Sequence, residues 1–433
     1  MSKTLMACTR GALAAGLFGI AAGEAGEATA ADATVMDAVR AGRPILEVRS
    51  RYEHWDQTKT RTLTENGQAL SVRARYGWET GAWNNVKGLV DIETVRWLGP
   101  RRFAITNKGG PPLNGADKVR YPAINDPEVT ELNRLQLTWT PSKAAQLTVG
   151  RQRIQLDDQR FVGAAPWRMD EQTFDAVRAD VSRGRFKATY AYVTKVNRTL
   201  GEIADWDSDS HFFNAGWSVS DALRVQALVY AFDFKQAPAS SNISKGVRIS
   251  GKGKLGPYAL SYAATYARQN DWRGNTAPFA LDYFGAEASA TRGIYTVRLG
   301  YDALEGNGQR GFGSAIGAAH GVNGWADAWS SAGGMKNFAD GLRDANVTVT
   351  VKPKHRWLPK KSELMARYHD FNDNRTGADL GREWNLSWIA PITSKMTVQW
   401  KYADFDRANS VPVGTLAPPA SRTKWWLTLE YKL

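Results

Sequence analysis

The sequence contains very little cysteine and almost no long apolar runs. Cys8 is the single cysteine among 433 residues, and residues 11–23 form the one long apolar stretch. A membrane helix needs about 20 consecutive apolar residues. The mean hydropathy of −0.43 agrees with the scarcity of such segments. The composition therefore excludes a helical membrane protein. A sustained 3.6-residue period is also missing, although residues 32–41 are predicted to form a short helix.

The first 30 residues have the features of a secretory signal peptide. Lys3 and Arg10 precede the apolar stretch, and an A-x-A motif at residues 28–30 follows it. We therefore predict that residues 1–30 are removed and that residues 31–433 form the mature protein. Cys8 is a poor lipobox cysteine, because the apolar residues follow it instead of preceding it. Its removal would leave no thiol and no disulfide, which suits export without oxidative folding.

Acidic residues are fewer than basic ones, and aromatic residues are abundant. The formal net charge is +13, beside 17 Trp, 15 Tyr and 15 Phe. Many aromatic residues with a low mean hydropathy suit a structure with an aromatic outer surface and a polar interior. The excess charge would serve either a surface facing anionic lipid or a lumen that concentrates an anionic solute. Nucleic acid is not expected as a partner, because the signal peptide directs the chain out of the cytoplasm.

The last eleven residues, 423–433, show the clearest local pattern. Apolar and mostly polar side chains alternate along this segment, the apolar ones being Trp425, Leu427, Leu429, Tyr431 and Leu433. Alternate side chains of a strand point to opposite faces, so the segment has one apolar face and one polar face. It is about as long as a tilted strand that crosses a bilayer. It resembles the closing strand of a bacterial outer-membrane barrel; the alternative is a strand of a soluble sandwich.

The same alternation recurs through most of the chain. Examples are residues 46–52, 70–78, 135–139 and 396–402. Short turns join many of these segments and alternate with long polar stretches near 100–130, 303–343 and 406–422. This arrangement predicts an all-β transmembrane antiparallel barrel of about 18 strands in the bacterial outer membrane, with 16 strands as the alternative. A soluble all-β protein is disfavoured, because the polar faces carry too many Arg, Lys and Glu side chains to be buried.

Several motifs carry a resemblance to a known family. They are residues 47–53 (EVRSRYE), 70–77 (LSVRARYG), 147–158 (LTVGRQRIQLDD), 167–168 (WR), 173–176 (TFDA) and 323–327 (NGWAD). Together they resemble the alginate export porin family, most specifically over residues 45–180. The resemblance implies a monomeric outer-membrane barrel of about 18 strands. It also implies a cationic pore for an acidic polysaccharide.

The resemblance and the strand pattern together suggest a set of pore residues. By motif position, Arg49, Arg73 and Arg153 correspond to pore cations of the family, and Asp170 falls near a pore aspartate. Arg134 lies one place from a family arginine, where an acidic residue would be expected, so alginate itself is in doubt. Arginines opposite the apolar strand faces should point into the lumen, where their planar guanidinium groups suit carboxylates. The predicted substrate-binding residues are Arg49, Arg73, Arg75, Arg134, Arg153 and Asp170.

Two structural questions about these arginines remain open. The first is whether they bind a solute or pair with Glu47, Glu53, Asp91 and Glu93 inside the barrel. Arg153 shares the parity of the apolar positions in its strand, which would place it toward lipid. Either a bulge at Gly150 reverses this parity, or the strand ends and Arg153 lies in a loop.

Catalytic and metal-binding patterns are missing from the sequence. The five histidines show no HExxH motif and no paired spacing for a metal, and no cofactor is predicted. We therefore predict a channel that is not an enzyme, with a cationic lumen for an anionic oligo- or polysaccharide or another anionic solute. Outer-membrane lipid would surround it. The alternative from a different class is an outer-membrane barrel enzyme that hydrolyses lipid or peptide.

Overall fold

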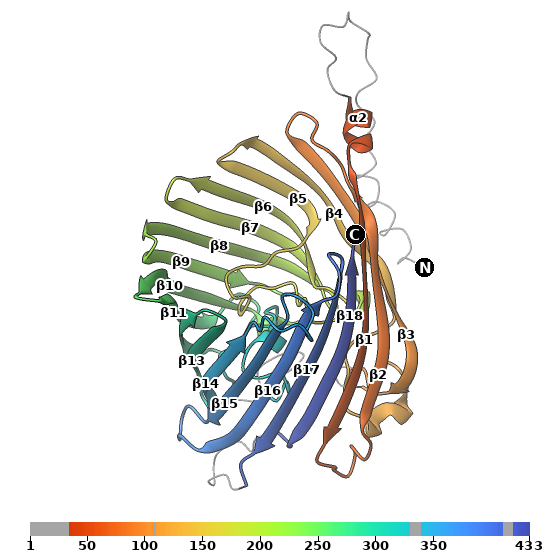
Figure 1. Ribbon diagram of the computed structural model, residues 1–433, viewed down its shortest axis with the longest axis vertical. Helices are drawn as coiled ribbons and strands as arrows, with labels where there is room; N and C mark the ends of the chain where they lie inside the picture. The colour runs from red at the N-terminus through yellow and green to blue at the C-terminus, as the bar shows by residue number, and fades with distance from the viewer. Residues whose placement is uncertain (1–33, 107–109, 330–338, 410–418) are drawn as a thin grey trace, which may run out of the picture.

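The protein is a closed antiparallel β-barrel of 18 strands (Figure 1). The computed structural model describes residues 34–106, 110–329, 339–409 and 419–433. The first strand pairs with both the second and the last, and the closing register runs from Glu47 opposite Lys432 to Gln57 opposite Arg422. The predicted 18-stranded barrel is thus confirmed, and the 16-stranded alternative is wrong. The predicted signal peptide and Cys8 lie outside the described residues.

The strands range from 8 to 17 residues in length. They are β1 (Arg43–Gln57), β2 (Gly67–Glu79), β3 (Val86–Arg102), β4 (Val129–Ser142), β5 (Ala145–Gln152), β6 (Thr173–Arg183), β7 (Phe186–Asn197), β8 (Trp206–Ser220), β9 (Leu223–Phe232), β10 (Asn242–Leu255), β11 (Tyr258–Asp271), β12 (Ala280–Arg292), β13 (Tyr295–Glu305), β14 (Gly341–Val351), β15 (Glu363–Asn372), β16 (Asp379–Pro391), β17 (Met396–Arg407) and β18 (Arg422–Lys432). The helices are α2 (Val35–Arg40) and the short 3-10 turns η1 (Ala116–Arg120), η2 (Glu202–Ala204), η3 (Pro238–Ser240) and η4 (Ala319–Gly321).

The alternation of side chains decides which face of each strand is buried. In β18, Leu427 and Leu429 are 47% and 41% exposed, whereas Trp426 and Lys424 are 1% and 2% exposed. The exposed apolar face is the one that suits hydrocarbon, and the polar face lines the interior. Within the described residues, none of the helices is long and apolar enough to cross a membrane.

The two ends of the barrel carry connections of different length. At one end, here called the short-turn end, seven connections have two to six residues and the eighth, 352–362, has eleven. Helix α2 precedes β1 at this end, where β18 also finishes (Figure 1). The opposite, long-loop end carries the predicted long segments, observed as connections 103–128, 306–340 and 408–421. The centre of the last one lies outside the described residues.

Two of the long loops fold into the lumen and pack against each other (Figure 1). These inner loops are residues 153–172 and the described part of residues 306–340. The backbone N–H of Gly163 donates to the carbonyl of Ile316 at 3.0 Å, and that of Ala318 donates to Gln159 at 2.8 Å. Phe161 and Phe312 are among the buried apolar side chains between the loops and the wall. The apolar core of this barrel therefore lies inside the lumen.

Candidate functional site

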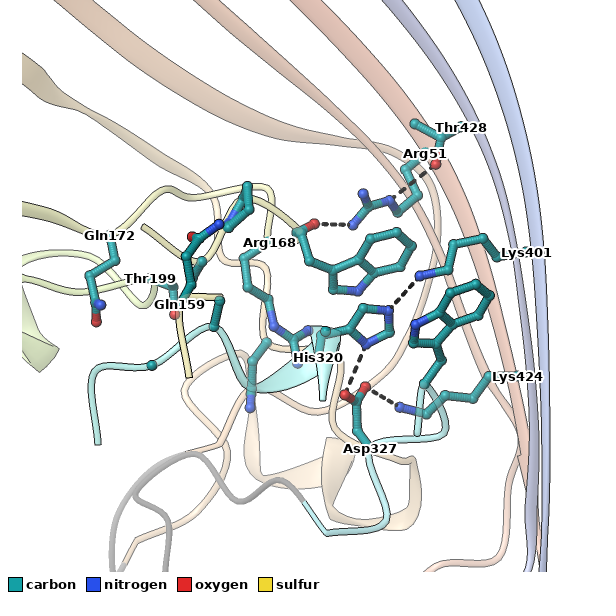
Figure 2. Close-up of a pocket in the computed structure, with 18 of the residues that line it drawn as sticks. Arg51, Gln159, Arg168, Gln172, Thr199, His320, Asp327, Lys401, Lys424 and Thr428 are labelled. Carbon is teal, nitrogen blue, oxygen red and sulfur yellow. Dashed lines mark hydrogen bonds and ion pairs between the residues drawn. The ribbon is translucent and has the colours of Figure 1, made fainter. Parts of the chain in front are cut away.

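A cavity of about 820 Å³ remains between the inner loops and the wall formed by β17, β18 and β1 (Figure 2). Its lining contains seven basic side chains against three carboxylates. The basic side chains are Arg49, Arg51, Arg168, Arg198, Lys401, Arg422 and Lys424, and the carboxylates are Asp158, Asp327 and Glu430. Because lumen-facing positions on three adjacent strands supply most of these cations, the cavity has one strongly basic wall.

Aromatic rings line the same wall and contact its cations. The Lys401 ammonium lies 3.5 Å from the ring centre of Trp325 and 3.9 Å from that of Trp167. The guanidinium carbon of Arg51 also lies 3.9 Å from the Trp167 ring, and the imidazole of His320 stacks on that ring at 4.0 Å with an angle of 9°. Contacts between cations and indole faces are attractive, and more so when water is excluded. They hold the inner loops against the wall.

Four polar side chains join an inner loop to the barrel wall, and we call them the latch: His320, Asp327, Lys401 and Lys424. His320 Nδ1 lies 2.9 Å from Asp327 Oδ1, and Lys424 Nζ lies 2.9 Å from Asp327 Oδ2. Lys401 Nζ lies 3.0 Å from His320 Nε2. Figure 2 shows these contacts as a continuous chain. The Asp327 carboxylate can only accept, so Nδ1 of His320 carries the proton that it donates to Asp327, and Nε2 accepts from Lys401.

Burial decides the protonation states of the two loop residues in the latch. It lowers the pKa of His320 well below its ordinary value, and the ammonium of Lys401 adds to the effect although Asp327 opposes it. Burial alone would raise the pKa of Asp327. The electrostatic attraction of His320 and Lys424, together with the hydrogen bond from His320, outweighs this effect and holds the pKa of Asp327 well below the usual range. At neutral pH the latch therefore contains a neutral imidazole and a carboxylate.

A second polar cluster lies beneath the other inner loop and is closed by ion pairs. The Arg75 guanidinium contacts Glu93 and also lies 3.1 Å from Glu171 of the loop. Arg153 binds the same Glu171 through two contacts of 2.5 and 2.6 Å. Burial alone would raise the pKa of Glu171, but Arg75 and Arg153 lower it to about 2. This buried network fixes the inner loop 153–172 to β2 and β3.

The structure places the six predicted pore residues in two environments. Arg49 lines the cavity, where it binds Glu430 at 2.8 Å and donates to the carbonyl of Pro166. The other five lie outside the cavity lining. Four of them are arginines that form ion pairs, namely Arg73, Arg75, Arg134 and Arg153, and the fifth is Asp170, which accepts a backbone hydrogen bond.

The predicted pore residues outside the cavity lie at different distances from their polar partners. Arg134 binds Asp91 at 2.5 Å, and Asp170 accepts from the backbone of Gly201 at 3.1 Å. Burial, with the neighbouring carboxylate of Glu131, raises the pKa of Asp170 well above its ordinary range. Arg73 is 1% exposed and lies 3.6 to 3.8 Å from three carboxylates. Pairing inside the barrel, one of the two possibilities that the sequence left open, is thus what the structure shows for the four arginines.

Arg153 lies in a loop, as one of the two predicted possibilities required. Strand β5 ends at Gln152, so the parity of the strand does not extend to Arg153. The register of β5 continues without a shift through Gly150, opposite Gln136 on one side and Ala176 on the other. The alternative of a register-shifting bulge at Gly150 is therefore wrong. Arg153 turns inward with the loop to reach Glu171.

Several residues of the basic wall were not singled out from the sequence. Lys401 and Lys424 stand at lumen-facing positions of β17 and β18, and Arg51 shares the parity of Arg49. One feature of the sequence pointed to this wall: Trp426 is an apolar residue on the polar face of the last strand. In the structure its side chain is buried in the lumen. Nothing in the sequence indicated His320, because its partner on the wall, Lys401 of β17, lies 81 positions later in the chain.

The latch is poorly suited to acid–base catalysis. A histidine held by an aspartate resembles part of a catalytic triad, but such a base needs a free ring nitrogen beside a nucleophile. In this site Nε2 of His320 accepts from Lys401. Among the described residues, the structure shows no group of three or more His, Cys, Asp or Glu that could hold a metal ion. The arrangement instead suits electrostatic attraction and the anchoring of a loop.

Comparison with known proteins gives consistent matches of fold and family. OccK9 (OpdG) of Pseudomonas aeruginosa has a TM-score of 0.68 at 12% identity, covering 92% of this chain and all of that chain. OpdK with vanillate, from the same organism, has a TM-score of 0.67 at 12% identity and coverages of 91% and 99%. OccK2 (OpdF) in complex with glucuronate, also from that organism, has a TM-score of 0.63 at 13% identity and covers 91% of this chain and 99% of that chain. At these identities the likeness shows the fold alone. No curated protein sequence matches the chain.

A family model described as alginate export matches residues 46–379, which is most of the chain. The match includes β1 to β15 and both inner loops. It agrees with the family suggested by the sequence motifs, and with the closed barrel and its outward apolar face. The protein is therefore an outer-membrane β-barrel channel that belongs to the alginate export family.

Proposed function

We propose that this channel passes anionic solutes, with acidic oligo- or polysaccharides as the first candidates. The observation that carries the proposal is the excess of seven basic side chains over three carboxylates around the cavity. A cleft lined by one sign of charge raises the local concentration of the opposite ion. Guanidinium groups also bind carboxylates through two parallel hydrogen bonds. Because one chain closes the barrel by itself, we further propose that the channel acts as a monomer.

In this proposal the predicted pore arginines divide into two roles. Arg49 acts on the solute together with Arg51, Lys401 and Lys424 of the same wall. The paired arginines, Arg75 among them, act by holding the inner loop that narrows the lumen. Two structural neighbours are described in complex with carboxylate compounds, vanillate and glucuronate, which supports a carboxylate-bearing solute. An outer-membrane hydrolase is the less favoured alternative, and a turnover assay would test it.

The proposed function predicts anion selectivity. In planar bilayers under a potassium chloride gradient, the reversal potential should show that chloride passes more readily than potassium. The preference should weaken as ionic strength rises, because the Debye length falls from about 10 Å at 0.1 M to about 3 Å at 1 M. A cation-selective current would contradict the proposal.

Arg49 offers a residue-level test of the basic wall. The change Arg49→Gln should weaken block by an anionic oligosaccharide by about tenfold, because a charge-assisted hydrogen bond contributes about 1.5–3 kcal/mol. The midpoint of denaturant unfolding should change little, since Glu430, the partner of Arg49, is 22% exposed and keeps contact with solvent when the arginine is removed. Arg134→Gln is the matched control, because its partner Asp91 is fully buried. That variant should lose stability and keep the block. The reverse pattern would remove Arg49 from the solute path.

A further inference from the structure

The excess positive charge of the protein is concentrated at the short-turn end. The charged side chains at each end are those in the connections and in the last two residues of every strand at that end, including the start of β1 and the finish of β18. Among the described residues, the short-turn end has 16 Lys or Arg against three Asp or Glu. The same count at the long-loop end gives 17 against 20. The net charge of +13 is therefore mainly a property of one rim of the barrel. In outer-membrane barrels, the short turns face the periplasm.

One connection contributes more of this charge than any other at that rim. Residues 352–362 contain five Lys or Arg and no carboxylate, in a rim whose other connections have at most one cation each. All five are exposed. Lys352 pairs with Glu363 at 3.3 Å, and in the described part of the chain no other cation of the connection has an ion pair. The four remaining cations are Lys354, Arg356, Lys360 and Lys361.

The same connection exposes a large aromatic side chain on an ordered backbone. Trp357 is 75% exposed, and the Arg356 guanidinium lies 4.6 Å from the centre of its ring. The N–H of Leu358 donates to the carbonyl of His355, and that of Ser362 donates to Pro359. Pro353 and Pro359 restrict the backbone further. A partner that binds here therefore meets a segment whose backbone is already restricted, which reduces the cost in backbone conformational entropy.

We propose that connection 352–362 is a docking site for an extended polyanion, a carboxylate-bearing polysaccharide chain, at the periplasmic mouth. The proposal rests on the proposed function, because the docked chain would be the solute of this channel. Four unpaired cations on one short segment match a polymer that repeats its charge along its length. The guanidinium of Arg356 suits a carboxylate, and the flat face of Trp357 offers an apolar surface for a sugar ring. The rest of the basic rim attracts the polymer over a longer range.

The test measures binding of a fluorescently labelled polyuronate oligomer to the full-length protein in neutral detergent. The loop variant is K354Q/R356Q/K360Q/K361Q, and Trp357→Ala is a second variant. The control is K143Q/R183Q/R185Q/K187Q, which removes four charges from the same rim between β4 and β7. The loop variant should bind about tenfold more weakly or worse, since each exposed charge contact contributes up to about 1 kcal/mol. Trp357→Ala should also weaken binding, and the control should change it less than about twofold.

Several outcomes would overturn this proposal. Equal losses in the loop variant and the control would mean that the rim attracts polyanions through its total charge alone. An unchanged affinity in the loop variant would exclude the connection. A membrane partner is tested by repeating the measurement in nanodiscs. If anionic lipids abolish the difference between wild type and loop variant while neutral lipids preserve it, the connection binds lipid head groups instead.

A separate measurement distinguishes this proposal from the proposed function. The loop variant should keep the anion selectivity of the lumen, because its changes lie at the rim and not in the cavity. Loss of docking with intact selectivity supports the site. An unselective channel that still loses polyuronate binding in the loop variant would contradict the function proposed for the lumen and keep the docking site.

Discussion

Replacing Arg75 with Met should lower the free energy of unfolding by about 3–5 kcal/mol. Methionine has a volume similar to that of arginine but carries no charge. The change therefore leaves two carboxylates in the interior without their shared partner. Glu93 is 0% exposed and Glu171 is 2% exposed. Breaking a buried ion pair by removing one partner has a cost of this size, since the remaining charge cannot be hydrated. Denaturant unfolding of the detergent-solubilised barrel measures the effect.

Two control variants make this result specific. Arg298 faces Glu287 at 3.6 Å with both side chains 47% exposed, so Arg298→Gln should change the free energy of unfolding by less than about 1 kcal/mol. Adding Glu93→Gln to Arg75→Met should recover part of the loss, because Glu93 loses its nearest cation in Arg75→Met, whereas Glu171 keeps its contacts with Arg153. Similar small losses in Arg75→Met and Arg298→Gln would show that the buried network does not stabilise the barrel.

Acidification from about pH 7.5 to about pH 5 should release the latch. In the latched state the pKa of His320 is well below its ordinary value, so the imidazole stays neutral there. In the released state the ring is hydrated and takes up a proton below about pH 6.5. The released state therefore binds more protons, and it gains stability relative to the latched state as the pH falls through this window. At pH 5 the latched-to-released ratio should fall by up to roughly 30-fold.

The lowered pKa of Asp327 causes a second loss of stability of the latched state at more acidic pH. The stabilisation that ionised Asp327 gives to the latched state is complete above the ordinary carboxyl pKa of about 3.9, and it is lost as the pH falls further. Spin labels on the inner loop 306–340 and on β17 would report the distance between loop and wall across the titration. The variant His320→Gln should show no transition between pH 6.5 and 5. A transition that persists in this variant would assign the pH dependence to another group.

Much of the architecture follows from the sequence, because it depends on a local rule. Successive side chains of a strand point to opposite faces whatever the rest of the chain does. Alternation in segments such as residues 70–78 and 423–433 was therefore enough to predict strands, to separate the lipid face from the lumen face, and to predict about 18 strands. It also placed Arg49, Arg73 and Arg75 on the inner face. The motifs at residues 147–158 and 323–327 indicated the family; the first covers the end of β5 and the start of one inner loop, and the second lies in the other inner loop.

Only the tertiary structure decided which of the inner cations border the cavity and which lie away from it beside the inner loop 153–172. Arg75 meets Glu171, 96 positions away in the chain, and Lys424 meets Asp327, 97 positions away. No local pattern encodes such contacts, because they depend on where two long loops lie after entering the lumen. The electrostatic effect of a charged side chain depends in turn on how deeply it is buried and on which groups it contacts. The alternation of the sequence thus determined the barrel and its two faces, whereas the folding of the inner loops decided that Arg49, Lys401 and Lys424 border the cavity and that Arg73, Arg75 and Arg134 do not.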